Sequence, residues 1–445
     1  MPAGTPSFRV SAGVEMHPPA RICAPAQPGR LLARALALGW ITHAGASSIH
    51  PVESSATPSA PRAPAAVTVG AVGAAGTDLA TLQRRFAEFA ASYAELPIYS
   101  AVCRGVATDS HCAALLQEAA PGQDRPVLWL AAVHDLVLRR PDVPAARWYA
   151  SVVGRDHLPI GDPWPDVRRT VLAHEDELRT VIASRTTQTN EVNRCVYLAP
   201  ALALACADRP DQPVLLVEMG ASAGLLLSLD RYRVELVGSD GLLVLGDRTS
   251  PVRCSGEDRS DRPLAGRHAA LALPRVVGRV GVDRHSVDLA DVDAVRWLEA
   301  CLWPDVPGRV ERFRSAVRLL ADAPSPVVAG DMVDDLPAVL AGAVDAAPAG
   351  THLVVFSSWA LTYVDRARRP EVARTLAAAA QEGRPVSWLT AEPPGCVPGI
   401  EATPEPEADR GQTTVLGLRR WRHGAEQASS VLGASHPHGQ WVKFG

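Results

Sequence analysis

The chain has 445 residues, enough for two or three domains with a sizeable core, and its formal net charge is −4. A slightly acidic chain lacks the general basic surface that binds nucleic acid, so we expect no nucleic-acid partner. The 8 cysteines form no C-x-x-C pair, which argues against a zinc ribbon or a redox motif and favours a reducing compartment.

Residues 1–76 are rich in Ala, Pro, Gly and Ser and show no sustained apolar period. Such a segment cannot bury enough apolar surface to offset the entropy lost on ordering, so we expect a disordered tail. The stretch from Leu31 to Ile41 is apolar, but Arg34 interrupts it and it is too short to span a bilayer. We therefore expect a soluble, cytoplasmic protein without a membrane contact.

Residues 77–212 show apolar side chains at helical spacing, and we expect a helical region that begins after an N-cap at Asp78. One long helix is predicted over 166–184. Polar side chains then gather before an apolar helix at 195–207. Helix capping by Asn190 and Glu191 explains part of this set, but capping needs neither Gln188 nor Arg194. We therefore predict that Gln188, Asn190, Glu191 and Arg194 bind a small-molecule substrate.

A short apolar run, 214–219, meets three small residues at alternate positions, Gly220, Ser222 and Gly224. An apolar run that continues through Asp230 follows them. The pattern predicts a buried strand, a tight turn and a helix. Such a turn leaves backbone N–H groups facing an open crevice, where a polar ligand approaches the backbone closely.

Four more buried strands are predicted at 276–282, 327–331, 353–358 and 386–389, with helices between them. Segments 413–422 and 440–444 predict a terminal strand pair joined by a long loop. Residues 232–270 form a polar, Gly-rich insertion that contains a candidate hairpin. We therefore expect an α/β fold over 213–445, with a Rossmann-like, doubly wound, mostly parallel sheet.

Two resemblances concern this part of the chain. Glu218 followed by the small-residue turn resembles the first motif of class I S-adenosylmethionine (AdoMet) methyltransferases, and the order of elements over 213–445 resembles their fold. Separately, several motifs occur together in the order of the bacterial family called domain of unknown function 2332, over about 80–445. They are Gln188-Thr189-Asn190-Glu191, the stretch from Glu218 to Leu225, Arg296-Trp297-Leu298 with Trp303-Pro304, Gly330-Asp331 and His438-Gly439.

The methyltransferase resemblance implies AdoMet as cofactor and a small molecule or a protein as methyl acceptor. Backbone N–H groups around Gly220, Ser222 and Gly224 would hold the methionine part, and Glu218 would reach its amino group. Two further acidic residues would contact the nucleoside, Asp283 at the ribose hydroxyls and Asp331 near the adenine. Two features depart from the pattern: Asp283 follows Gly220 by 63 residues, which the insertion explains, and Ser222 replaces the middle glycine.

Methyl transfer asks mainly for alignment of the acceptor, so the sequence need not display an acid–base pair. An acceptor that must lose a proton would need a base, for which His438, His436 and Glu191 are candidates. The spacing of Asp331, Asp334, Asp335 and the two histidines is not diagnostic of a metal, and we predict none.

Two alternatives remain. Residues 220–224 also match G-x-S-x-G, the nucleophile elbow of α/β-hydrolases, with Ser222 as nucleophile, Asp331 or Asp335 as the acid and His438 as the base. The second alternative is a ligand-binding protein on a methyltransferase-like fold without turnover.

Overall fold

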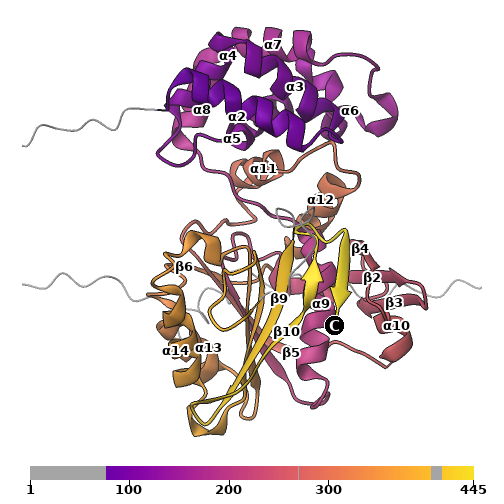
Figure 1. Ribbon diagram of the computed structural model, residues 1–445, viewed down its shortest axis with the longest axis vertical. Helices are drawn as coiled ribbons and strands as arrows, with labels where there is room; N and C mark the ends of the chain where they lie inside the picture. The colour runs from indigo at the N-terminus through magenta and orange to yellow at the C-terminus, as the bar shows by residue number, and fades with distance from the viewer. Residues whose placement is uncertain (1–76, 269, 402–412) are drawn as a thin grey trace, which may run out of the picture. The chain divides into compact units, whose positions relative to one another are not determined.

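The computed structural model describes residues 77–268, 270–401 and 413–445, all of which belong to one compact unit, Gly70–Gly445. The predicted tail, residues 1–76, lies outside the described residues. Along the chain a helical region comes first and a mixed α/β region with a large sheet follows (Figure 1). The expected α/β class, with a helical region before a large sheet, is therefore confirmed.

The helical region shares one apolar core, which includes Phe86, Trp129 and Val133. Asp78 caps the first helix as predicted, because its side chain accepts a hydrogen bond from Thr81 N. Trp297 belongs to the same core, so α11 (Val292–Ala300) of the later chain packs against this region. The α-helices are α2 (Leu79–Ser92), α3 (Pro97–Thr108), α4 (Ser110–Ala114), α5 (Pro126–Arg139), α6 (Ala150–Val153), α7 (Trp164–Ala173) and α8 (Glu175–Ser184).

The single helix expected over 166–184 is two helices, α7 and α8, which meet at His174. His174 has φ −127° and ψ 29°, outside the helical region. Three acidic residues, 175–177, stand in the first turn of α8, where the helix dipole favours negative charge. The apolar period continues across the break, so the sequence pattern did not reveal it.

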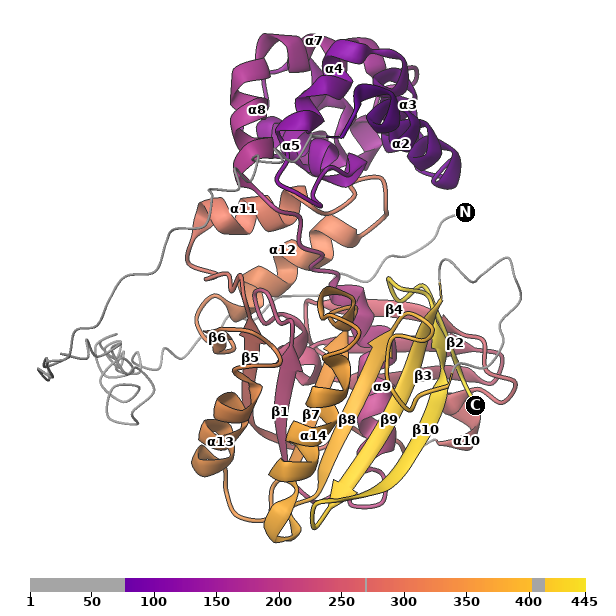
Figure 2. The same ribbon diagram turned by 60° about the vertical axis from the view of Figure 1, so that its left-hand side comes forward.

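The strands join in one 11-stranded sheet, in the order β3-β2-β4-β11-β10-β9-β8-β7-β1-β5-β6. Figure 2 shows β1, β7, β8 and β9 side by side in its middle. The strands are β1 (Val214–Met219), β2 (Arg233–Gly238), β3 (Gly241–Gly246), β4 (Arg253–Asp258), β5 (Val276–Asp283), β6 (Val327–Ala329), β7 (His352–Ser358), β8 (Val386–Glu392), β9 (Thr414–Arg422), β10 (Ala425–Ser435) and β11 (Trp441–Phe444).

The five strands β6-β5-β1-β7-β8 pair in parallel and form the doubly wound part of the sheet. Chain order runs outward from β1 in both directions, so the order reverses between β1 and β7. In open α/β sheets, ligands bind in the crevice at the carboxyl ends of the strands at such a point. This topology places any ligand site beside Met219 and Ser358, where β1 and β7 end.

Helices cover both faces of the parallel strands. Side chains of α9 (Cys195–Cys206) and α12 (Arg309–Leu320) share one core with Leu216 and Val354. Side chains of α13 (Leu336–Ala346) and α14 (Arg369–Ala379) share another core on the opposite face. Burial on both faces explains why β1 and β7 are buried at every position.

The insertion 232–270 holds the predicted hairpin, in which β2 pairs antiparallel with β3. It also supplies β4, which pairs in parallel with β11 and so joins the insertion to the main sheet. At the C-terminus the expected loop is wrong: residues 425–435 form β10, which pairs with β9 and β11. The first six residues of β10 are exposed, which explains why no apolar pattern signalled this strand.

The helix expected after β1 is also wrong. A short 3-10 helix, Leu226–Arg231, follows the turn instead, with non-helical dihedrals at Ser228 (φ −102°, ψ 22°). The remaining α-helices are α10 (Leu264–Arg267) and α11 (Val292–Ala300). Among the described residues, no helix has the length and apolar character needed to cross a membrane.

Candidate functional site

The turn after β1 has the backbone shape that its small residues predict. Gly220, Ser222 and Gly224 have φ of 75°, 51° and 67°, a region that L side chains rarely adopt. A Cβ added to Gly220 would lie 2.6 Å from Ala360 Cβ. The turn therefore packs closely against the loop that follows β7, and position 220 has no room for a side chain.

Four N–H groups of this turn, those of residues 220, 221, 222 and 224, are already bonded within the chain. Gly220 N and Ala221 N donate to Val282 O at 2.9 and 3.3 Å, and Gly224 N donates to Ala221 O at 2.7 Å. Ser222 N donates to Asp283 Oδ2 at 2.8 Å. The expectation that the N–H groups of positions 220, 222 and 224 face a ligand is therefore not met. No long helix begins here either, so the side chains around the turn become the candidates for polar contacts with a ligand.

Ser222 lies in a network of amides. Its hydroxyl donates to Gln188 Oε1 at 2.9 Å and accepts from Asn190 Nδ2 at 3.2 Å. Gln188 Nε2 in turn donates to His285 O at 3.0 Å. The polar segment before α9 thus lines the crevice at the end of β1, as the sequence predicted. The hydroxyl partners of Ser222 are two amides, and no histidine of the described residues bonds to it.

Asp283 ends β5 beside this network. Its carboxylate accepts from Ser222 N and, at 2.8 Å, from His285 N. A carboxylate offers about four acceptor positions, so two remain for a ligand. Asp283 is among the residues that line the cavity described below.

Asp331 follows β6 and is fully engaged. Its Oδ1 accepts from Val333 N and Asp334 N at 2.8 and 2.9 Å, and its Oδ2 accepts from Nε and Nη2 of Arg284. The carboxylate has no free position for an adenine amine, and it does not line the cavity, whereas Arg284 does. Asp335, its alternative in a hydrolase, accepts from Asp331 N.

Glu218 is a buried carboxyl group with an unsatisfied oxygen. Its side chain is buried, and its Oε2 has no hydrogen-bond partner. Burial is the main cause that raises the pKa of Glu218 well above its ordinary value, and the negative charge of Asp283 is the second. Burial therefore favours the neutral form of this carboxyl group, which lines a small cavity.

Arg194 is a buried cation in the wall of the same small cavity. Its Nε donates to Pro437 O at 3.3 Å and its Nη1 to Ser358 O at 3.0 Å. Both partners are neutral carbonyls, and no acidic side chain of the described residues pairs with it. A buried guanidinium without a counterion favours the binding of an anionic group.

Glu191 and His438 lie in a second buried cluster. Glu191 Oε2 is 2.6 Å from Arg309 Nε, and Glu191 Oε1 accepts from Asn193 N at 3.0 Å. The His438 ring is close to Arg309 Nη2, at 3.4 Å, and to Trp303. Burial, and then the charges of Arg309 and Arg194, lowers the pKa of His438 well below its ordinary value. His436 Nδ1 accepts from His438 N at 3.1 Å.

A cavity of about 280 Å³ lies at the carboxyl ends of β1, β5 and β7. It shares part of its wall with the smaller cavity, of about 20 Å³, that Glu218 lines. The position is the topological switch point of the sheet, where the fold class places ligands. The walls of the larger cavity include Gln123, Thr186, Thr187, Gln188, Thr189, Arg194, Gly220, Ser222, Asp283, Arg284, His285, Met332, Ser358, Trp359, Ala360, Thr362 and Tyr363.

Sequence reasoning missed the loop after β7 and the residue that holds it. Trp359 has φ 58°, and its indole N–H donates to Thr414 Oγ1 at 2.8 Å. Glu392, at the end of β8, accepts from Ala360 N and Leu361 N at 3.1 and 3.3 Å. Burial raises the pKa of Glu392 to about 7. The only sequence signal was that both residues follow or end a predicted buried strand.

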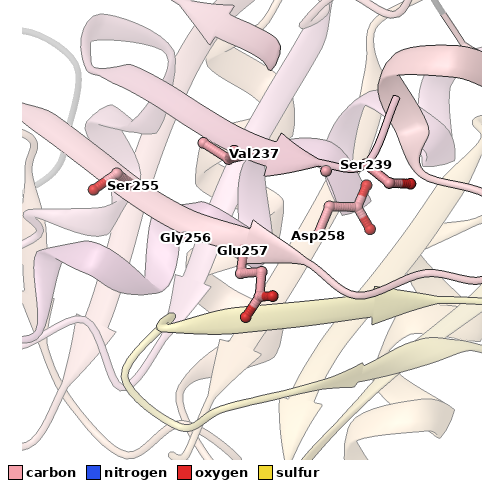
Figure 3. A pocket seen from close by; sticks show the side chains of 7 residues that line it. Val237, Ser239, Ser255, Gly256, Glu257 and Asp258 are labelled. Atoms are coloured by element: carbon pink, nitrogen blue, oxygen red, sulfur yellow. The ribbon is translucent and has the colours of Figure 1, made fainter. Parts of the chain in front are cut away.

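A second hollow, of about 610 Å³, is an open groove over β2 and β4 (Figure 3). Its two carboxylates are used within the chain: Asp258 accepts from Ser260 N and Leu264 N, and Glu257 pairs with Arg259. Among the described residues, no buried side-chain polar atom of this groove lacks a partner, so the cavity at the switch point is the candidate site. Among the described residues, no group of three or more His, Cys, Asp or Glu side chains could hold a metal ion.

Comparison with known proteins identifies the family but no activity. No curated protein matches the chain. The model of a family described as uncharacterized protein conserved in bacteria (DUF2332) matches residues 83–444. That match spans most of the sequence, including the polar segment before α9, the turn after β1 and the C-terminal strands. The chain therefore belongs to the DUF2332 family of bacterial proteins.

Proposed function

We propose that this chain binds AdoMet at the carboxyl ends of β1, β5 and β7 and transfers its methyl group to a small molecule or a protein. The observation that carries the proposal is the presence of a buried carboxyl group and a buried guanidinium at the small cavity. Glu218 presents an unsatisfied carboxyl oxygen, and Arg194 presents a guanidinium that pairs with no acidic side chain in the described part of the chain. One acid and one base at the same cavity match the ammonium and carboxylate groups of an α-amino acid, which the methionine part of AdoMet carries.

The other residues at the cavity support the same ligand. Asp283 retains acceptor positions for two ribose hydroxyls, whereas the adenine would lie against Arg284 and Met332 instead of Asp331. AdoMet supplies an electrophilic methyl group when it is bound. The chain's own task is then to align an acceptor and to exclude water. Gln123 and residues 186–189 are polar and uncharged at the cavity wall, and we assign acceptor binding to them.

No acid–base group is required for an acceptor that carries a free lone pair. Glu191 and His438, the predicted bases, are paired with Arg309 in this structure. Either residue would have to leave that partner to accept a proton from an acceptor. We therefore place both in the support of the Arg194 segment, because Asn193 and Arg194 hold the 437–439 loop through its carbonyl groups.

The test is titration calorimetry of the full chain with AdoMet and with S-adenosylhomocysteine. Glu218→Gln and Arg194→Gln should each weaken binding about tenfold or more, because each removes one charge-assisted contact. Glu392→Gln is the matched control, since Glu392 is also a buried carboxyl with an unsatisfied oxygen but does not line the cavity. No binding of either ligand to the wild-type chain would contradict the proposal.

A serine hydrolase is the second candidate, and one observation favours it. Ser222 has φ 51°, the strained conformation that a nucleophile elbow gives its serine. A reaction would require a base to displace Gln188 or Asn190 from the hydroxyl. Covalent labelling of Ser222 by a fluorophosphonate, together with no AdoMet binding, would establish this alternative.

A further inference from the structure

A separate pocket lies at the opposite end of the parallel strands. Its volume is about 230 Å³, and it opens at the amino ends of β7 and β8, where His352 and Ser387 stand. The candidate site lies at Ser358, at the other end of β7. Six residues of extended chain separate the two along this strand, a distance of about 20 Å.

Three guanidinium groups line this pocket, those of Arg209, Arg420 and Arg422. Arg420 donates to Ala205 O at 2.9 Å, and Arg422 has no side-chain partner among the described residues. Arg209 lies 3.9 Å from Asp208, which is the one acidic residue of the pocket wall. Three positive charges therefore face one negative charge, and their mutual repulsion is relieved if an anion binds.

The floor of the pocket is polar and built from buried side chains. His352 Nε2 is 2.9 Å from Ser387 Oγ, and both side chains are buried. Burial, and then the charge of Arg420, lowers the pKa of His352 to about 4, so the imidazole is neutral at pH 7. The ring and the hydroxyl add neutral hydrogen-bonding groups beneath the arginines.

Two of the arginines lie on β9, opposite a register shift in its pairing with β10. Arg420 and Arg422 are two positions apart on β9, so both side chains point to the same face of the sheet. Opposite them, the register of β10 shifts between Glu426 and Ala428. A β-bulge of this kind redirects a side chain, and the bulged residue, Gln427, joins the pocket wall.

We propose that this pocket is a second binding site, specific for a small oxyanion, the phosphate or carboxylate group of a small molecule. Planar guanidinium groups bind such oxygens in pairs, and the pocket is large enough for one small ligand. The site is independent of the cofactor proposed above.

The test is calorimetric titration of the full chain with inorganic phosphate and, separately, with malonate, each against sodium chloride at matched ionic strength. We expect binding of at least one oxyanion at up to millimolar concentration, and the two titrations distinguish a phosphate from a carboxylate ligand. Arg422→Gln should weaken oxyanion binding about tenfold, because it removes one charge-assisted contact. The fold should be unaffected, because this exposed arginine has no side-chain partner among the described residues. Arg420→Gln should weaken it at least as much.

Two variants with the same change of charge serve as controls. Arg366→Gln alters an exposed arginine outside the pocket, and Arg194→Gln alters the cation of the other site. Both should keep the wild-type affinity for the oxyanion. The proposal is overturned if neither oxyanion binds at millimolar concentration, or if Arg366→Gln or Arg194→Gln weakens binding as much as Arg422→Gln does.

Discussion

The two ends of the parallel strands differ in the burial and the sign of their ionisable side chains. At the carboxyl ends, the Glu218 carboxyl group and the Arg194 guanidinium are buried, and neither forms an ion pair with another described residue. At the amino ends, Arg420 and Arg422 are more exposed and of one sign. A buried carboxyl group that can ionise and a buried cation suit a zwitterionic ligand, whereas exposed charges of one sign cost little and suit an oxyanion. The same sheet therefore offers two different kinds of site.

The largest effect should come from the turn at the carboxyl ends. Gly220→Ala should lower the free energy of unfolding by about 4 kcal/mol, from left-handed strain and from the contact with Ala360 together. Gly122→Ala is the control, because Gly122 has φ 79° but nothing within 4 Å of an added Cβ. It should cost only about 1 kcal/mol. Equal losses in urea titrations of the two variants would show that the close packing of the turn is unimportant.

The second prediction concerns Glu392, whose pKa is raised by burial from 4.5 to about 7. A carboxyl with a raised folded pKa destabilises the protein as the pH increases from 4.5 to about 7, since the unfolded state loses its proton first. Glu392→Gln removes this loss. Relative to wild type it should gain about 3 kcal/mol in free energy of unfolding between pH 4.5 and pH 8. A difference that does not vary with pH would contradict the assignment.

His352, at the amino ends, should show the opposite slope. Burial and the charge of Arg420 lower its pKa from 6.5 to about 4, so the unfolded state binds a proton first as the pH falls. The wild-type protein therefore loses stability from this group between pH 6.5 and pH 4. His352→Gln should gain about 3 kcal/mol relative to wild type over that range. Urea titrations at several pH values measure both slopes, and slopes of the same sign would remove the contrast between the two ends.

The smallest effect should come from Ser222→Ala, which removes hydrogen bonds to Gln188 and Asn190. We expect a loss of about 1 kcal/mol in stability and a few-fold loss in AdoMet affinity. A serine hydrolase would instead lose its activity entirely. Esterase assays and fluorophosphonate labelling of both proteins distinguish the two outcomes.

Local patterns in the sequence predicted the parts of the site that neighbouring residues determine. The buried strand before Glu218, the turn at Gly220 and the polar segment that begins at Gln188 follow from short apolar runs and small residues. The contacts that define the chemistry join distant residues, such as Arg194 with Ser358 and Pro437, and no local pattern encodes them. The hydrogen bonds from the turn N–H groups to Val282 and Asp283 likewise depend on a neighbouring strand, β5.

The sequence-based predictions of the fold that were wrong also have local causes. The apolar residues after the turn predicted an α-helix because they are buried. They form a short 3-10 helix instead, in which Ser228 bonds to Ser325. Strand β10 is polar and exposed over its first half, so only its pairing with β9 identifies it. The amino-end pocket was not predicted, because its arginines come from α9's end and from β9, more than two hundred residues apart in the chain.

Proton release on AdoMet binding tests the central claim most directly. In the free protein, burial raises the pKa of Glu218 well above its ordinary value and so favours the protonated carboxyl group. An ammonium group bound beside it favours the ionised form, so binding should release a proton. Calorimetry in two buffers of different ionisation enthalpy should show net proton release by the wild-type chain and none by Glu218→Gln. Binding with no proton release in the wild type would contradict the assignment of Glu218 as the acceptor of the amino group.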